Sequence, residues 1–211
     1  MGRSEDPPAN ANVVTMSTAA PLQAGERRVM SVEEWASLPE DEPGELVDGV
    51  LAKEEAADWD HEDVVAWLLL VLGAWVMARG GRVYGSEGKY AIRPGRGRKA
   101  DVSAFLAGTP LPPRHGPSTT PPDIIVEVIS SDPRDARRDR IDKANEYAAF
   151  GARFYWLIDP DDRTFEIFEL QAGAHYLRVR AASEGAIDVP GCEGLQVDLD
   201  ALWAYVDRRV S

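Results

Sequence analysis

Two short apolar runs, each interrupted by a single acidic residue, dominate the hydrophobic pattern of the chain. Residues 124–130 read Ile-Ile-Val-Glu-Val-Ile-Ser, and residues 99–105 read Lys-Ala-Asp-Val-Ser-Ala-Phe. Runs of β-branched and apolar residues bounded by Pro, Gly or Ser predict buried strands. A carboxylate inside a buried strand is costly on its own, so Asp101 and Glu127 need a metal ion, a Lys or Arg, or backbone N–H groups as partners. The alternative is that both acids lie at strand ends in solvent.

The long apolar run of the chain covers residues 64–78. Its apolar residues occupy every side of a helix, which predicts a helix that is buried on more than one face. The helix is expected to begin after a capping Asp58 or Asp60 and to run to about Arg79, with Gly80-Gly81 as its stop. The run is too short to span a bilayer, which takes about 20 residues, so we expect no membrane contact. A second copy of the chain is the natural partner for the remaining face, and we hypothesise a homodimer.

The rest of the pattern predicts short strands and helices separated by turns. Ser31, followed three residues later by Glu34, forms a capping box that opens a short helix. Asp48-Gly49 between apolar pairs predicts a β-hairpin over residues 45–53 with a type I′ turn. Further elements are expected as strands over 82–84, 89–93, 154–159, 164–170 and 175–180, a turn over 94–97, a loop over 107–122, a helix over 132–149 that opens at Asp132-Pro133, and a helix after Asp198. The helix over 132–149 is expected to place on one face Ile141, Ala144, Tyr147 and Ala148.

Composition indicates one soluble globular domain. The chain has 211 residues, of which 44% are hydrophobic and 28% charged. Residues 1–27 lack apolar periodicity and predict a disordered tail, which leaves residues 28–211 as a single domain. Cys192 is the single cysteine, which excludes an internal disulfide and a Cys-based zinc site and suits a reducing compartment. Because the first residues also lack the apolar core of a signal peptide, we expect a cytoplasmic protein.

The net charge of −13 opposes binding to nucleic acid, which is driven by Lys and Arg. Basic residues nevertheless gather around the two acids. The group before Asp101 consists of Arg93, Arg96, Arg98 and Lys99. The group after Glu127 consists of Arg134, Arg137, Arg138, Arg140 and Lys143. The alternative is that they are solvated turn and helix positions, which Asp135, Asp139 and Asp142 neutralise in part.

Three carboxylates on predicted strands, Glu45, Asp101 and Glu127, offer hard oxygen ligands, which select Mg²⁺ or Mn²⁺ over zinc. A divalent ion at such a site favours hydrolysis of a phosphodiester. Lys143 is the candidate for holding the attacking water or stabilising the transition state, although a lysine on a helix is more often a surface residue. His61 is a candidate base or phosphate donor, and a capping or partly buried imidazole is the alternative.

The order of these residues resembles the Uma-two family of putative restriction endonucleases, in the PD-(D/E)XK nuclease superfamily. The similarity runs from about Ser31 to Tyr205. It is carried by Val32-Glu33-Glu34-Trp35, Leu38-Pro39, Glu45-Leu46-Val47-Asp48-Gly49, His61, residues 122–130, Asp139, Lys143, Tyr147, Gly151, residues 155–160 and Thr164. The resemblance implies an α/β (α+β) restriction-endonuclease-like core, in which a mixed central β-sheet is flanked by helices.

The resemblance also implies roles for the acids. Glu45 would be the first acid, Asp101 the metal-binding Asp of the PD motif, and Glu127 the acid of the (D/E)XK motif. Two positions depart from the superfamily pattern. Ala100 stands where the Pro of PD is usual, which affects the backbone more than the chemistry. Ile129 occupies the lysine position, and the resemblance implies that the next helix supplies the lysine as Lys143.

Three functions are consistent with these residues. The first is a cytoplasmic, homodimeric endonuclease that hydrolyses DNA and uses Mg²⁺ or Mn²⁺ held by Glu45, Asp101 and Glu127. The second is a catalytically silent nuclease-fold module that binds nucleic acid or a protein partner, which the negative charge favours. The third is a metal-independent hydrolase that uses Asp101 and Glu127 as an acid and base pair.

Overall fold

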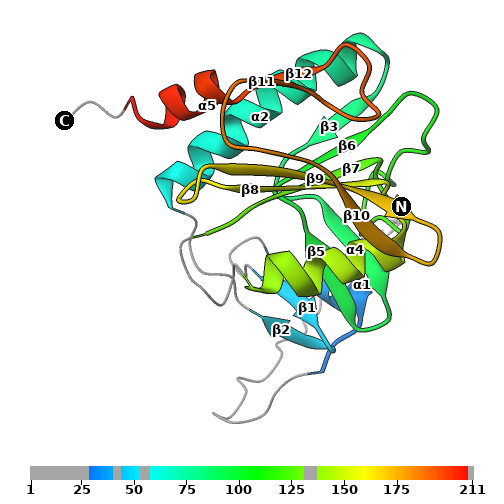
Figure 1. Ribbon diagram of the computed structural model, residues 1–211. Helices are drawn as coiled ribbons and strands as arrows, with labels where there is room; N and C mark the ends of the chain where they lie inside the picture. The colour runs from blue at the N-terminus through cyan, green and yellow to red at the C-terminus, as the bar shows by residue number, and fades with distance from the viewer. Residues whose placement is uncertain (1–28, 40–43, 53–57, 131–136, 209–211) are drawn as a thin grey trace, which may run out of the picture.

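The computed structural model describes residues 29–39, 44–52, 58–130 and 137–208 (Figure 1). The predicted tail over 1–27 and the predicted helix start at Asp132-Pro133 lie outside these residues. In the described part of the chain, a central sheet carries α2 and α5 on one face, and α4 with a second, smaller sheet lies on the other side (Figure 1). This arrangement confirms the expected fold class, a mixed central sheet flanked by helices.

Within the described residues, the central sheet has six strands in the order β10-β9-β8-β7-β6-β3. The strands are β3 (Arg82–Tyr84), β6 (Val102–Phe105), β7 (Ile124–Val128), β8 (Phe154–Asp159), β9 (Thr164–Gln171) and β10 (His175–Ala182). β7 and β8 are parallel, and the other neighbours are antiparallel. The parallel pair needs a crossover connection, which here contains helical segments η1 and α4.

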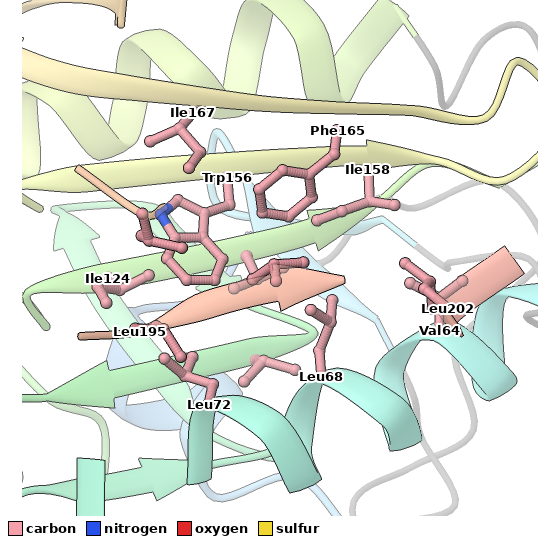
Figure 2. Close-up of a cluster of buried hydrophobic side chains, with 14 of the residues drawn as sticks. Val64, Leu68, Leu72, Ile124, Trp156, Ile158, Phe165, Ile167, Leu195 and Leu202 are labelled. Carbon is pink, nitrogen blue, oxygen red and sulfur yellow. The ribbon is translucent and has the colours of Figure 1, made fainter. Parts of the chain in front are cut away.

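One face of this sheet packs on four elements that include the long helix. They are α2 (Trp59–Ala78), α5 (Leu199–Val206), β11 (Ala186–Asp188) and β12 (Gln196–Asp198). Figure 2 shows the resulting core, in which Leu68 and Leu72 of α2 share one buried cluster with Ile124 and Trp156 of the sheet. β11 and β12, of three residues each, were absent from the predicted elements.

Helix α2 buries one of its faces in this core. Val64, Leu68 and Val76 are at most 1% exposed, whereas Leu70 and Met77 on the opposite side are 75% and 61% exposed. The prediction that more than one face is buried is therefore wrong within the single chain, because the sheet covers one side of the helix. Among the described residues, α2 is the one helix long and apolar enough to cross a membrane by length and composition, and a core helix passes the same test.

The other face of the central sheet is covered by the second sheet and the crossover segment. In the described residues, this second sheet has the order β2-β1-β5-β4. The elements on this side are α1 (Val32–Ala36), β1 (Glu45–Val47), β2 (Val50–Ala52), β4 (Lys89–Arg93), β5 (Arg96–Lys99), the π-helical η1 (Arg138–Lys143) and α4 (Ala144–Phe150). Val126 and Val128 of β7 belong to the α2 side, so the alternating Glu127 faces this second side.

The predicted hairpin is confirmed as β1 and β2. Its turn residues Asp48 and Gly49 have φ values of 50° and 77°, and a type I′ turn requires positive φ at both central positions. The predicted turn over 94–97 is partly wrong, because β5 begins at Arg96. A Cβ on Gly97 would lie 2.3 Å from Trp35 Cζ3, so this glycine permits close packing against a ring and does not form a turn.

Two further predictions need correction. Asp101 lies in a bend between β5 and β6 and not inside a strand. Ile141 does not share the buried face of its helix, since it is 49% exposed. Tyr147 and Ala148 of the predicted face are buried, and the other buried residues in the described part of this segment are Asp139 and Lys143. The π-helical turn explains the difference, because its larger number of residues per turn changes which side chains face the sheet.

Candidate active site

All five residues predicted for the site come together beside the end of β7. Glu127 lies within β7, and Asp101 directly precedes the neighbouring strand β6, where Val102 pairs with Val126. Glu45 opens β1 and Lys143 ends η1, and both lie on the second side of the sheet. His61 is in the first turn of α2, with its Nε2 3.2 Å from Asp101 Oδ2. Segments far apart in the chain thus assemble one cluster of charges.

Glu127 is at the centre of the cluster and is 1% exposed. Lys143 Nζ donates a hydrogen bond to its Oε2 at 2.7 Å, and the Tyr147 hydroxyl donates to its Oε1 at 2.7 Å. Burial raises the pKa of Glu127 well above its usual value; the charge of Lys143 opposes the shift, and the nearby acids add to it. The sequence indicated that a buried Glu127 needs a positive partner, and that partner is Lys143.

Asp101 is the acid through which this cluster reaches solvent, since its side chain is 17% exposed. The Val128 N–H donates to its Oδ2 at 2.7 Å, and His61 lies beside the same oxygen. Burial by itself would raise the pKa of Asp101, but the hydrogen bond and charge of His61, with the charge of Lys143, lower it. The same contact raises the pKa of His61 against the effect of burial. A carboxylate ion is therefore maintained at the edge of the site.

Glu45 is held by different partners. Arg98 Nη1 donates a hydrogen bond to its Oε2, and the Lys99 N–H donates to its Oε1 at 3.0 Å. Burial opposes ionisation of Glu45, but Lys143 and Arg98 together lower its pKa. Its Oε1 is also 3.8 Å from Lys143 Nζ. The role of Glu45 as a metal ligand stays a prediction. Its carboxylate contacts Arg98, Lys143 and the Lys99 N–H.

Lys143 points into the cluster and is 3% exposed. In addition to Glu127, its Nζ contacts Asp139 Oδ1 at 3.2 Å. Burial alone would lower the pKa of Lys143, but the surrounding carboxylates raise it well above its usual value, so the side chain remains an ammonium ion. Ile129, at the position where the superfamily carries its lysine, is buried in an apolar cluster, and Lys143 is the ammonium beside Glu127.

Three residues of the cluster were missing from the predicted site. Tyr147 bonds Glu127, Asp139 contacts Lys143, and Arg98 bonds Glu45. The spacing of four between Asp139, Lys143 and Tyr147 is a signal that these residues share a helix face. Arg98 gave no such signal, because its contact with Glu45 depends on the pairing of β1 with β5, where Leu46 pairs with Gly97.

Two carboxylates of the cluster are chemically suited to a hard divalent cation. Asp101 and Glu127 offer carboxylate oxygens from adjacent chain segments, and Mg²⁺ is commonly bound by one or two carboxylates together with water and substrate phosphate. Among the described residues, no group of three His, Cys, Asp or Glu side chains is arranged to hold a metal ion. The residues therefore fit an ion that relies on Asp101 and Glu127 and completes its shell from solvent and substrate.

The basic residues near the acids are mostly engaged within the protein. Arg96 pairs with Asp48 and Glu146, Arg98 with Glu45 and Glu146, Lys99 with Glu87, and Arg140 with Asp159 and Glu166. Arg98 is 1% exposed, so it is not a solvated turn position. Arg98 pairs with the buried Glu45, and Arg96 pairs with the exposed Asp48 and the partly buried Glu146, so both arginines are engaged by acids of the protein itself. Arg134 lies outside the described residues.

The mixed central sheet flanked by helices places the chain in the restriction-endonuclease-like class of folds. A model of the Uma2 family, described as putative restriction endonuclease, matches residues 31–201. The chain therefore belongs to the Uma2 family.

Comparison with solved structures shows the same fold. A crystal structure titled as a putative nuclease belonging to DUF820, from Anabaena variabilis, matches with a TM-score of 0.65 and 18% sequence identity. The match covers 84% of this chain and 99% of that chain. No curated protein matches the sequence.

Proposed function

We propose that this protein is an endonuclease that hydrolyses DNA phosphodiester bonds with the help of Mg²⁺ or Mn²⁺. The family and the fold support a nuclease. The observation that carries the proposal is the buried Glu127–Lys143 pair beside the partly exposed Asp101. A buried ion pair contributes little net stability, so a cluster of this kind is better explained by chemistry than by folding.

Asp101 and Glu127 would hold the divalent ion. When bound, the ion lowers the pKa of a coordinated water and neutralises charge on a phosphoryl oxygen. Lys143 supplies a fixed ammonium beside Glu127, where it can orient the attacking water or stabilise the additional negative charge of the transition state. His61 keeps Asp101 ionised and fixes its orientation through the 3.2 Å contact. Glu45, bound by Arg98, adds to the negative charge that retains Lys143.

Nicking of supercoiled plasmid tests this proposal. The wild-type protein should nick plasmid in Mg²⁺ or Mn²⁺, and Asp101→Asn should not. Asp161→Asn makes the same change at an exposed turn residue and should nick like the wild type. Nicking that persists in EDTA would instead select the acid and base hydrolase, in which Asp101 and Glu127 act without an ion.

A catalytically silent binding module is the second candidate. It is favoured by the closed site, because the side chains of Glu127 and Lys143 are 1% and 4% exposed in the described conformation. The internal pairing of Arg96 and Arg98 also leaves fewer cations for phosphate. A wild-type protein that binds DNA in a gel-shift assay, at the same affinity as Asp101→Asn and without nicking, would identify this function.

We further propose a cytoplasmic homodimer that uses the exposed side of α2. Ala66, Leu70, Ala74 and Met77 follow one another along that side, and Leu70 is 75% exposed. An apolar stripe of this kind is a common feature of protein interfaces. Light scattering should give twice the monomer mass for the wild type and the monomer mass for Leu70→Glu. A wild-type mass equal to that of one chain would refute the dimer.

A further inference from the structure

Asp139 is a buried acid to which the proposed reaction assigns no role. It is 3% exposed and lies in the π-helical turn η1, four residues before Lys143. Its Oδ1 is 3.2 Å from Lys143 Nζ, closer than Glu45 Oε1 at 3.8 Å. Because desolvation offsets most of the attraction in a buried ion pair, stability alone is a weak reason for an acid at this place.

The turn that carries Asp139 is fixed to the central sheet. The Tyr155 hydroxyl on β8 donates a hydrogen bond to the Asp139 carbonyl oxygen at 2.9 Å, and Tyr155 is 1% exposed. Asp139 and Lys143 belong to the same π-helical segment, so the backbone holds their side chains in a defined relation. Turns of this type occur frequently at functional sites.

Glu45 is less suited to hold Lys143 by itself. Arg98 Nη1 and the Lys99 N–H already donate hydrogen bonds to its two carboxylate oxygens. The Lys143 ammonium lies beyond hydrogen-bond distance from it, at 3.8 Å. Among the described residues, Glu127 and Asp139 are therefore the acids nearest the Lys143 ammonium: Glu127 accepts its hydrogen bond at 2.7 Å, and Asp139 forms an ion pair with it at 3.2 Å.

We propose that Asp139 is a positioning residue that retains the Lys143 ammonium in the site when Glu127 is engaged by a divalent ion. Lys143 and the ion compete for the same carboxylate, since Lys143 donates to Glu127 at 2.7 Å. Asp139 remains as a second anionic partner on the same helical segment, so Lys143 keeps its place beside Asp101 and Glu127. This inference rests on the proposed metal-dependent function.

Nitrogen-edited NMR of the lysine ammonium groups tests the inference without any cleavage. The resonance of Lys143 is identified by its loss in Lys143→Met, and Mg²⁺ alone is then titrated into each protein. In the wild type and in Asp142→Asn, an exposed neighbour on the same segment, the resonance should shift and persist. In Asp139→Asn it should broaden beyond detection as Mg²⁺ is added. Equal spectra for Asp139→Asn and the wild type throughout the titration would overturn the proposal.

Kinetics separate positioning from ligation. Asp139→Asn should lower kcat about 10–100-fold, the usual effect of losing a group that orients a catalytic one, with KM for plasmid and Mn²⁺ affinity within about 3-fold of wild type. Asp139→Glu, which keeps the charge, should restore most of the rate. A fall in Mn²⁺ affinity parallel to kcat would make Asp139 a metal ligand and refute the positioning role.

The two parts of the experiment distinguish failure of the function from failure of the inference. A wild-type protein that binds Mg²⁺ but does not nick DNA refutes the nuclease, and the NMR titration still decides the role of Asp139. If Asp139→Asn does not fold, Asp139→Ser takes its place, because it also removes the carboxylate and keeps a polar group. A Lys143 resonance that persists in Asp139→Ser as in the wild type throughout the Mg²⁺ titration would then overturn the inference.

Discussion

Replacing Lys143 by Met should destabilise the protein far more than replacing a surface lysine by Met would. Met keeps an unbranched stem of similar size and removes the charge. In the folded protein the ammonium is 2.7 Å from Glu127 and 3.2 Å from Asp139, and its side chain is 4% exposed. At an effective dielectric constant of about 20, the contact with Glu127 alone represents a gross attraction of about 6 kcal/mol, which desolvation of the ions offsets in part.

Removing one partner of a buried pair leaves the other charge uncompensated and typically costs about 3–5 kcal/mol. We expect a loss of that size in the free energy of unfolding of Lys143→Met at neutral pH. The loss should be smaller at mildly acidic pH, because Glu127, whose pKa is already raised, then accepts a proton and the uncompensated charge disappears. The raised pKa of Lys143 keeps the wild-type ammonium charged throughout this range, so the pH effect belongs to the variant.

Urea unfolding followed by tryptophan fluorescence measures both losses, since Trp156 is fully buried. Lys99→Met is the matched control, because Lys99 pairs with Glu87, which is 79% exposed. A pair with an exposed partner is worth about 0–1 kcal/mol. A Lys143→Met variant that loses no more stability than Lys99→Met would refute the view that Lys143 is the buried counter-ion of the site.

Three other outcomes follow from the structure. Tyr147→Phe removes the 2.7 Å donor to Glu127 and should cost about 1–3 kcal/mol in urea unfolding, and a loss below the error of the fit would argue against that bond. Gly97→Ala brings a Cβ to 2.3 Å from Trp35 and should lower stability by about 1–3 kcal/mol, whereas an unchanged melting temperature would show that the ring has room to move. EDTA should abolish nicking and added Mn²⁺ should restore it. Nicking that continues in EDTA would show that the reaction needs no metal ion.

Much of the fold could be predicted because its signals are local. The hairpin of β1 and β2 follows from Asp48-Gly49, whose positive φ values satisfy a requirement of two adjacent residues. Strand β8 was predicted over its full length, residues 154–159, from a continuous apolar run. Gly97 was misread as a turn residue, because the reason for this glycine is the Trp35 ring, which is distant in the sequence.

The site was only partly predictable, for the same physical reason. The cost of burying Glu127 implied a positive partner, but helical periodicity could not select Lys143 for that role. Its inward direction depends on a π-helical turn and on packing against the sheet. The resemblance to a known family suggested Lys143, and the structure places it there. The Arg98–Glu45 contact could not be predicted, since it requires the pairing of β1 with β5.

The central claim is that Glu127 serves chemistry at the expense of stability, and Glu127→Gln tests it most directly. A carboxyl whose pKa is raised on folding stabilises the protein fully below its ordinary pKa, here 4.5, and this contribution is lost as the pH rises through the folded value. Glutamine is neutral at every pH and keeps hydrogen-bonding atoms for Lys143 and Tyr147. Unlike Lys143→Met, this change leaves no uncompensated charge, because Lys143 still pairs with Asp139 at 3.2 Å and with Glu45 at 3.8 Å.

The measurement is the plasmid-nicking rate in Mn²⁺ and the melting temperature of wild type and Glu127→Gln from matched preparations. We predict that Glu127→Gln loses nicking while its melting temperature is equal to or above that of the wild type, with a difference that grows from acidic to neutral pH. Equal nicking by both proteins would contradict the account. So would a melting temperature of Glu127→Gln that falls further below that of the wild type as the pH rises.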